Sequence, residues 1–206
     1  MKMFLFVIFM LFEAQLEINM KFENPISNIN EVKIKIRGSG NQTIIREYDG
    51  YFGRYPDEVY VGETLYKNVK STINLTENEN IITFKWNSKI TYCCFSMFSG
   101  YSNITEVVFT HFDDYEIIGA SYMFWGCESL TSIDFGNFGT SKITTMYGMF
   151  SYCINLNNLN LSAFNTSSLE KMGEMFYNCS KLTSIDLSNF DTSKVTNMFL
   201  IFGYCE

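Results

Sequence analysis

Cysteine is the residue whose type and spacing most suggest chemistry in this sequence. Cys127, Cys153, Cys179 and Cys205 recur at intervals of 26 residues. Equivalent residues on neighbouring parallel chain segments lie about 4.7–4.9 Å apart, which is within the Cα separation that a disulfide requires. Buried thiols that pack as small hydrophobic side chains explain the column more simply. Zinc-binding spacing is absent, so we expect neither a metal nor a cofactor.

Residues for nucleophilic or acid–base catalysis are sparse. A nucleophilic site needs a base beside serine or cysteine. His111 is the sole histidine, and later repeats place Asn137, Ala163 and Asn189 at its position, as expected for a solvated loop residue. A glycine-rich phosphate loop is also absent from the sequence. We therefore expect a protein that is not an enzyme.

The N-terminus is predicted to be a signal peptide of about 20 residues. Lys2 precedes an apolar run from Met3 to Phe12, which has the length of a signal-peptide core and is too short for a membrane span. Ala14 is the only small residue near a cleavage site, so the signal is either removed or retained. An N-terminal core strand or helix is the alternative. A secreted or cell-surface protein without a transmembrane span is expected.

Six Asn-x-Ser/Thr sequons are compatible with glycosylation in a eukaryotic secretory pathway. They begin at Asn41, Asn74, Asn103, Asn160, Asn165 and Asn178.

The formal net charge of −7 lies entirely in the second half of the chain. Residues 1–90 carry 11 Lys and Arg against 11 Asp and Glu, whereas residues 91–206 carry 4 against 11. An acidic surface repels phosphate, so neither nucleic acid nor an anionic membrane is an expected partner.

A 26-residue repeat is the strongest pattern in the sequence. The pair Met97-Phe98 recurs as Met123-Phe124, Met149-Phe150 and Met175-Phe176, and Ile201-Phe202 continues the series. An aliphatic residue follows three positions after the cysteine column, at Leu130, Leu156 and Leu182. Such register without insertions predicts units that stack and bury each apolar column against its own copies.

Each unit shows two hydrophobic periods. The alternation within Leu182–Phe190 predicts a short strand. After the polar turn at 191–193, Val195, Met198, Ile201 and Phe202 have helical spacing, which predicts a short helix or 3₁₀ turn. Stacked units of this kind predict an α/β repeat solenoid with a parallel sheet along one side.

These residues resemble a known family. The pattern L-x-x-I-x-L-x-x-F in Leu182–Phe190 is similar to the leucine-rich-repeat signature, and the block Met175–Met198 is similar to BspA-like repeats, also known as a domain of unknown function in mycoplasma and protist surface proteins. The resemblance covers residues 86–206. It implies a leucine-rich-repeat-like fold and an extracellular or surface-attached protein, in some cases with a role in adhesion. It supplies no catalytic residues.

Residues 21–85 are predicted to form a β-rich N-terminal cap that covers the first repeat. Alternating apolar residues at Val32, Ile34 and Ile36, followed by apolar runs at 59–61 and 81–86, predict short strands. An independent ligand-binding module is the alternative. At the other end, the chain stops midway through a unit, so we expect either that the final helix closes the core or that the array is truncated.

The candidate binding face is the outward side of the predicted repeat strands, which carries small polar and acidic side chains. Its residues are Glu106, Ser132, Asp134, Asn158, Asn160, Ser184 and Asp186. The face lacks the Trp, Tyr and Arg residues that dominate most protein interfaces. We expect a protein-binding or adhesion module whose partner is a protein or carbohydrate at the cell surface. A structural surface-coat protein that self-associates through its repeats is the alternative.

Overall fold

The computed structural model describes residues 30–44, 55–67, 69, 71–87, 92–112 and 117–205 of the chain. The expected signal peptide, residues 1–20, lies outside this part. The described residues form ten strands and no helix. Within these ranges there is accordingly no helix that could cross a membrane.

Two long antiparallel strands organise the N-terminal part. β1 (Asn30–Arg37) buries Val32, Ile34 and Ile36 on one side, because alternate side chains of a strand point to opposite faces. β6 (Glu79–Trp86) pairs with β1 along its whole length. The strands predicted around residues 32–36, 59–61 and 81–86 are confirmed.

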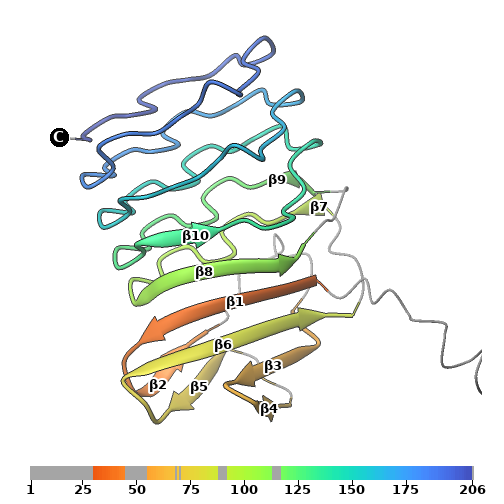
Figure 1. Ribbon diagram of the computed structural model, residues 1–206, viewed down its shortest axis with the longest axis vertical. Coiled ribbons are helices and arrows are strands. Elements are labelled where there is room, and N and C mark those ends of the chain that lie inside the picture. Colours follow the sequence, from red (N-terminus) through yellow and green to blue (C-terminus); the bar gives the residue numbers. More distant parts are fainter. Residues whose placement is uncertain are drawn as a thin grey trace, which may run out of the picture.

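The ten strands form three sheets. Besides β1 and β6, they are β2 (Gly40–Thr43), β3 (Glu58–Val61), β4 (Thr64–Tyr66), β5 (Thr72–Leu75), β7 (Tyr92–Cys93), β8 (Ile104–His111), β9 (Ile117–Gly119) and β10 (Ser132–Asp134). The largest sheet has the order β10-β8-β1-β6-β3-β4 (Figure 1). Its pairs are antiparallel except β8 with β10, which run parallel. β2 pairs with β5, and β7 pairs in parallel with β9.

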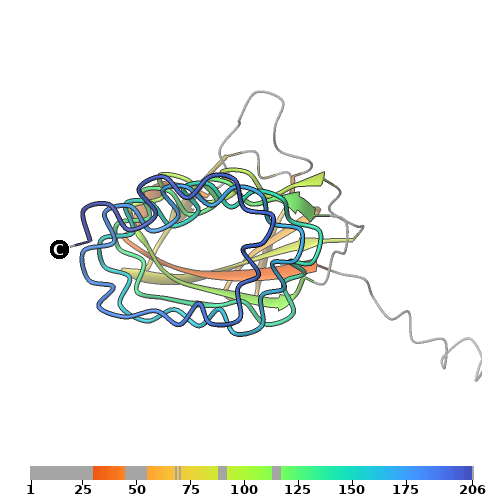
Figure 2. The same ribbon diagram turned by 90° about the horizontal axis from the view of Figure 1, so that it is seen from above.

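The 26-residue repeats lie one above another from the layer that contains β8 to the C-terminal end (Figures 1 and 2). We number five units by their apolar pairs, from Met97-Phe98 in the first to Ile201-Phe202 in the fifth, and call the chain around each pair a Met-Phe arc. The arcs are residues 94–101, 120–127, 146–153, 172–179 and 198–205. The N–H of Phe98 donates to the C=O of Met123 at 2.8 Å, and the same bond recurs between every later pair of neighbouring units. These backbone bonds fix the register of the repeats.

The predicted helical turns are wrong, and so is the α/β solenoid fold class, because the described part of the chain is all β. An α-helix requires each N–H to bond the C=O four residues earlier. On the arcs, alternate N–H groups donate instead to the next unit. Each arc also has two residues with positive φ, such as Tyr122 at 57° and Gly126 at 70°. These left-handed residues interrupt any right-handed helix.

The leucine-rich-repeat-like parallel sheet is likewise wrong, since the sheet that forms is mixed and Leu182–Phe190 contains no strand. Local side-chain hydrogen bonds compete with strand pairing in the repeats. The Oδ1 atom of Asp134 accepts the N–H of Gly136 at 2.9 Å where β10 ends. In a later unit, Oδ1 of Asp186 accepts the N–H of Ser188 at 2.8 Å.

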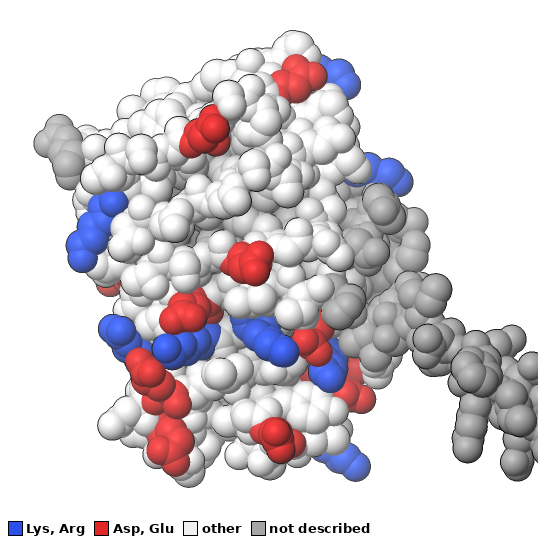
Figure 3. Space-filling model, viewed as in Figure 1, with Lys and Arg blue, Asp and Glu red and all other residues white. Residues whose placement is uncertain are grey.

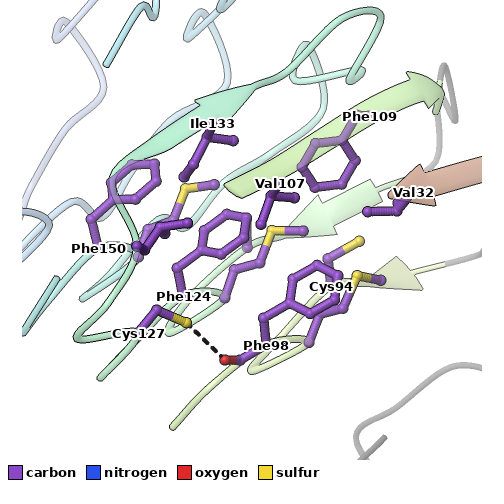
Figure 4. Packing of buried hydrophobic residues seen from close by; sticks show 14 of the residues in the cluster. Val32, Cys94, Phe98, Val107, Phe109, Phe124, Cys127, Ile133 and Phe150 are labelled. Carbon is purple, nitrogen blue, oxygen red and sulfur yellow. Dashed lines mark hydrogen bonds between the residues drawn. The ribbon is translucent and has the colours of Figure 1, made fainter. Parts of the chain in front are cut away.

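The predicted burial of the Met-Phe and cysteine columns is confirmed for the first four units. Figure 4 shows Phe98, Phe124 and Phe150 packed side by side. Their ring centroids are 5.6 Å and 5.7 Å apart, and the rings are nearly parallel. Phe176 continues the column at 5.6 Å and is also fully buried. In the fifth unit Phe202 is 45% exposed, so this column is less buried there than in the first four units.

Candidate functional site

The binding face predicted from the sequence is exposed to solvent at every named position. Ser132 lies beside Glu106 in the parallel register of β10 and β8. In the next two repeats, Asn158, Ser184 and Asp186 line a shallow depression of about 460 Å³. The remaining members of the polar face, Asp134 at the end of β10 and Asn160 at the equivalent position of the next unit, are exposed, and each accepts the N–H two residues later. The structure therefore assembles these residues into one polar face.

The carboxylates of this polar face are already engaged. Glu106 forms an ion pair with Lys35 at 3.3 Å. Asp134 and Asp186 each accept a backbone N–H, and hydrogen bonds from the hydroxyl and N–H of Ser188 hold the pKa of Asp186 below its usual value. On the face seen in Figure 3, charged side chains gather around the N-terminal strands, whereas the repeats show mostly uncharged atoms. Each carboxylate of the polar face is thus held by its own chain, although only Glu106 has a cationic partner in the described ranges.

Two of the six sequons lie opposite each other. Asn41 on β2 and Asn74 on β5 are register partners, and both are exposed. Side chains of such a pair leave the same face about 4.5–5.5 Å apart, so a glycan on one would crowd a glycan on the other. Asn103 donates from Nδ2 to Oε1 of Gln42 at 2.7 Å. The other three, Asn160, Asn165 and Asn178, lie outside the strands.

A second exposed surface was not expected from the sequence. We call it the aromatic ridge; it consists of Trp125, Tyr152, Tyr177 and Tyr204, one from each of the second to fifth units. Successive ring centroids are 5.6, 5.4 and 5.1 Å apart, with interplanar angles of 67°, 53° and 64°. Edge-to-face and tilted pairs of this kind are the arrangement that aromatic rings prefer. Trp125 is 41% exposed and Tyr204 is 67% exposed, so the ridge presents ring surface to solvent.

Glycines of adjoining units make room for rings on the arcs. A Cβ atom added at Gly203 would lie 2.9 Å from the ring of Tyr177. One added at Gly148 would lie 2.7 Å from the ring of Tyr122. The rings therefore pack directly on the backbone of the next unit. A ring held in place before binding loses little conformational entropy when a partner binds.

The ridge is hidden in the sequence because it alternates between two neighbouring columns. One column reads Ser99, Trp125, Ser151, Tyr177, Gly203, and the next reads Gly100, Gly126, Tyr152, Asn178, Tyr204. Neither column is aromatic by itself. Read together, they supply one aromatic and one small or amide residue in each unit from the second to the fifth, and this combined pattern is the signal that could have predicted the ridge.

Beside the ridge, Glu174 bonds to one tyrosine, and its charge acts on two more. The hydroxyl of Tyr147 donates a hydrogen bond to Oε1 of Glu174, and this bond raises the pKa of Tyr147 to about 12. The rings of Tyr122 and Tyr147 are 5.5 Å apart. Partial burial raises the pKa of Tyr122 and of Tyr177, and the charge of Glu174 raises both further. We call these four residues the Tyr–Glu cluster.

The cysteine column consists of free thiols, so the disulfide alternative is not realised. The S–H of Cys127 donates to the C=O of Phe98 at 3.0 Å (Figure 4), and later members repeat this bond. Burial raises the pKa of Cys153 well above its usual value, and that of Cys179 to about 12. Such thiols are poor nucleophiles and poor metal ligands. In the described ranges, no three His, Cys, Asp or Glu residues gather around a metal position.

Comparison with known proteins gives one match. No curated protein and no solved structure matches the chain. A family model matches residues 93–206, from the end of β7 through all five repeat units, which is more than half of the chain. The chain therefore belongs to the family described as Mycoplasma protein of unknown function, DUF285.

Proposed function

We propose that this chain is a secreted or cell-surface recognition module of the BspA-like kind, without catalytic activity, and that it binds a protein partner through the aromatic ridge. The ridge is the observation that carries the proposal. Trp and Tyr are the residues most enriched among those that dominate binding energy at protein interfaces. The polar face, which the sequence favoured, has no such rings among its ladder residues.

The repeat does not require aromatic side chains at the ridge positions. Ser99 and Ser151 occupy the column of Trp125, and Gly100 and Gly126 occupy the column of Tyr152. The backbone of the arcs therefore accommodates small residues at both places. Exposed rings at positions where serine or glycine also fits support a role in binding rather than in folding.

The same columns supply the substitutions for a test. The double variant Trp125→Ser and Tyr152→Gly introduces only residues that the repeat already holds there. Binding of the purified protein to immobilised cell-surface and matrix proteins should weaken at least about tenfold, because each lost ring removes a dominant contact. Thermal unfolding of the variant, followed in parallel, checks that the fold persists.

A matched control changes the polar face instead. Asp134→Asn with Asp186→Asn keeps the side-chain oxygen that closes each turn, as Asn160 does in its own unit. We expect this variant to bind as the parent chain does. Loss of binding in the control, with none in the ridge variant, would move the function to the polar face.

Self-association through the repeats is a second candidate function, favoured by apolar exposure in the fifth unit. Met198, Phe199 and Phe202 are 44%, 63% and 45% exposed. Burial of such side chains against another molecule is favourable by about 25 cal/mol per Å² of apolar surface. Assembly that rises with protein concentration in sedimentation velocity, and that Phe199→Ser abolishes, would support a structural coat role. A monomer at all concentrations would exclude it.

A further inference from the structure

We propose that the Tyr–Glu cluster is a subsite for a cationic side chain, lysine or arginine, of the partner protein. Glu174 supplies the charge, and the rings of Tyr122, Tyr147 and Tyr177 supply aromatic walls. This inference rests on the proposed function, because it takes the partner to be a protein that contacts the Met-Phe arcs.

Two glycines leave the space in which the rings approach Glu174. Tyr122, Gly148 and Glu174 occupy the same position in the second, third and fourth units. Because Gly148 has no side chain, the ring of Tyr122 lies over it, and a Cβ there would approach the ring to 2.7 Å. Gly173 leaves the same space for the ring of Tyr147, 2.9 Å from a Cβ at that position. Rings from two earlier units thus extend toward one carboxylate in the fourth.

Backbone geometry holds this arrangement in place. Tyr122 and Glu174 have φ angles of 57° and 54°, and the N–H of each donates to the next unit at 2.9 Å and 2.8 Å. Tyr177 is tied to the same turn because its N–H donates to the C=O of Glu174 at 3.0 Å. The cluster is therefore formed before any ligand binds.

The charge of Glu174 is uncompensated within the described part of the chain. The ion pairs there all join residues of β1, β6 and β8. Glu174 receives one hydrogen bond, from the neutral hydroxyl of Tyr147 to Oε1, so Oε2 remains available. The half of the chain that contains the repeats has 11 acidic against 4 basic residues, and this excess attracts cationic groups.

The chemistry of the cluster suits an organic cation better than a metal ion. A lysine ammonium or arginine guanidinium within about 6 Å of a Tyr ring is attracted to the negative face of the ring, and a carboxylate adds a charge-assisted hydrogen bond. A divalent metal ion needs several oxygen ligands, and among the described residues Glu174 belongs to no group of three or more His, Cys, Asp or Glu residues that could hold one. The subsite therefore recognises a basic side chain.

The test titrates the full chain with a decapeptide of alternating lysine and glycine, followed by NMR of the tyrosine ring signals. Signals of Tyr122, Tyr147 and Tyr177 should shift together. Glu174→Gln should weaken binding at least about fivefold, which corresponds to the loss of about 1 kcal/mol. Tyr147→Phe removes the hydroxyl but keeps the ring and frees the carboxylate, so binding should be retained. Tyr122→Leu removes a wall and should weaken binding.

Two controls separate the subsite from general charge attraction. Glu170→Gln neutralises an exposed acid at the start of the same unit and should leave the affinity unchanged. The Nε-acetylated peptide, which carries no side-chain charge, should not shift the tyrosine signals. An equal loss in Glu170→Gln and Glu174→Gln, or binding of the acetylated peptide, would overturn the proposal.

The outcome is distinguishable from failure of the proposed function. The ridge variant Trp125→Ser with Tyr152→Gly leaves all four cluster residues unchanged, so it should still bind the lysine peptide. If that variant keeps its binding to proteins while Glu174→Gln loses the peptide, the ridge proposal fails and the subsite stands. If Glu174→Gln changes nothing in either assay, the subsite fails alone.

Discussion

Substitution of Gly148 by alanine tests whether the ring of Tyr122 packs against this glycine. Gly148 has a φ of 59°, and Gly126, at the other left-handed position of the preceding arc, has a φ of 70°. A side chain in this left-handed region costs about 1–2 kcal/mol, so both glycines carry the same backbone penalty. They differ in surroundings, because the nearest atom to a Cβ at Gly126 is Cα of Gly100 at 3.5 Å, whereas a Cβ at Gly148 meets the ring of Tyr122 at 2.7 Å.

The expected costs follow from this difference. Gly126→Ala should lower the free energy of unfolding by about 1–2 kcal/mol, which is the backbone strain alone. Gly148→Ala should cost about 2–3 kcal/mol, because the displaced ring of Tyr122 also loses its contact with Tyr147, and such a contact contributes about 0.5–1.5 kcal/mol. Urea unfolding with a common slope measures both values.

A double-mutant cycle isolates the ring contribution. Tyr122→Ser introduces the residue that Ser96 provides at the same position of the first unit. In that background Gly148→Ala should cost no more than Gly126→Ala, which leaves a coupling energy of about 1 kcal/mol between positions 122 and 148. If Gly148→Ala lowers the free energy of unfolding equally with and without the ring of Tyr122, the packing of that ring against Gly148 is refuted.

Further predictions concern strain, burial and titration in the repeats. Leu200 has a φ of 48° and is 42% exposed. Leu200→Gly should raise the free energy of unfolding by about 0.5 kcal/mol, because the relief of left-handed backbone strain exceeds the entropic cost of glycine. Urea unfolding of this variant, compared with Leu200→Ala, measures the difference. Ser151 is fully buried and its hydroxyl has no hydrogen-bond partner, so Ser151→Ala should raise the melting temperature by removing a desolvation penalty of about 1 kcal/mol. The hydrogen bond to Glu174 raises the pKa of Tyr147 to about 12. The contribution of this bond to the free energy of unfolding should be complete below pH 10 and lost as the pH rises through 12. In an ultraviolet titration, Glu174→Gln should therefore lower the titration midpoint of one tyrosine. Burial raises the pKa of Cys153, so this thiol should resist alkylation until the chain unfolds, and rapid labelling of the folded protein would contradict that assignment.

The repeat register and the buried columns were readable from the sequence, but the backbone between them was not. Identical apolar residues every 26 positions must pack against their own copies, and the Met-Phe and cysteine columns do so. Helical spacing of Val195, Met198 and Ile201 was misleading because the arc buries side chains at similar intervals while its N–H groups bond to the next unit. The positive φ of residues such as Tyr122 and Glu174 could not be predicted, because glycine is the residue type that most often indicates a positive φ in a sequence.

The binding surfaces were predictable to a different degree. Exposure of the polar face followed from simple alternation, and the structure confirms it. The aromatic ridge escaped because its rings occupy two columns in turn. The Tyr–Glu cluster escaped for a further reason: its members come from three units and meet only because Gly148 and Gly173 leave space between them.

On the arcs, the groups that stabilise the stacking of the repeats are distinct from the side chains that are exposed to a partner. Register is fixed by backbone hydrogen bonds and by buried rings such as Phe124 and Phe150, neither of which depends on the outward columns. Those columns hold Trp, Tyr, Ser, Gly and Asn without any change in backbone register. Substitution at the ridge should therefore alter recognition with little loss of stability, whereas substitution of an inward phenylalanine should cost about 3–5 kcal/mol. A surface free to vary over a repeated backbone register is what a recognition module requires, and the combination of exposed rings with the carboxylate of Glu174, which has no ion pair in the described part of the chain, supports a partner that presents a basic segment to the arcs.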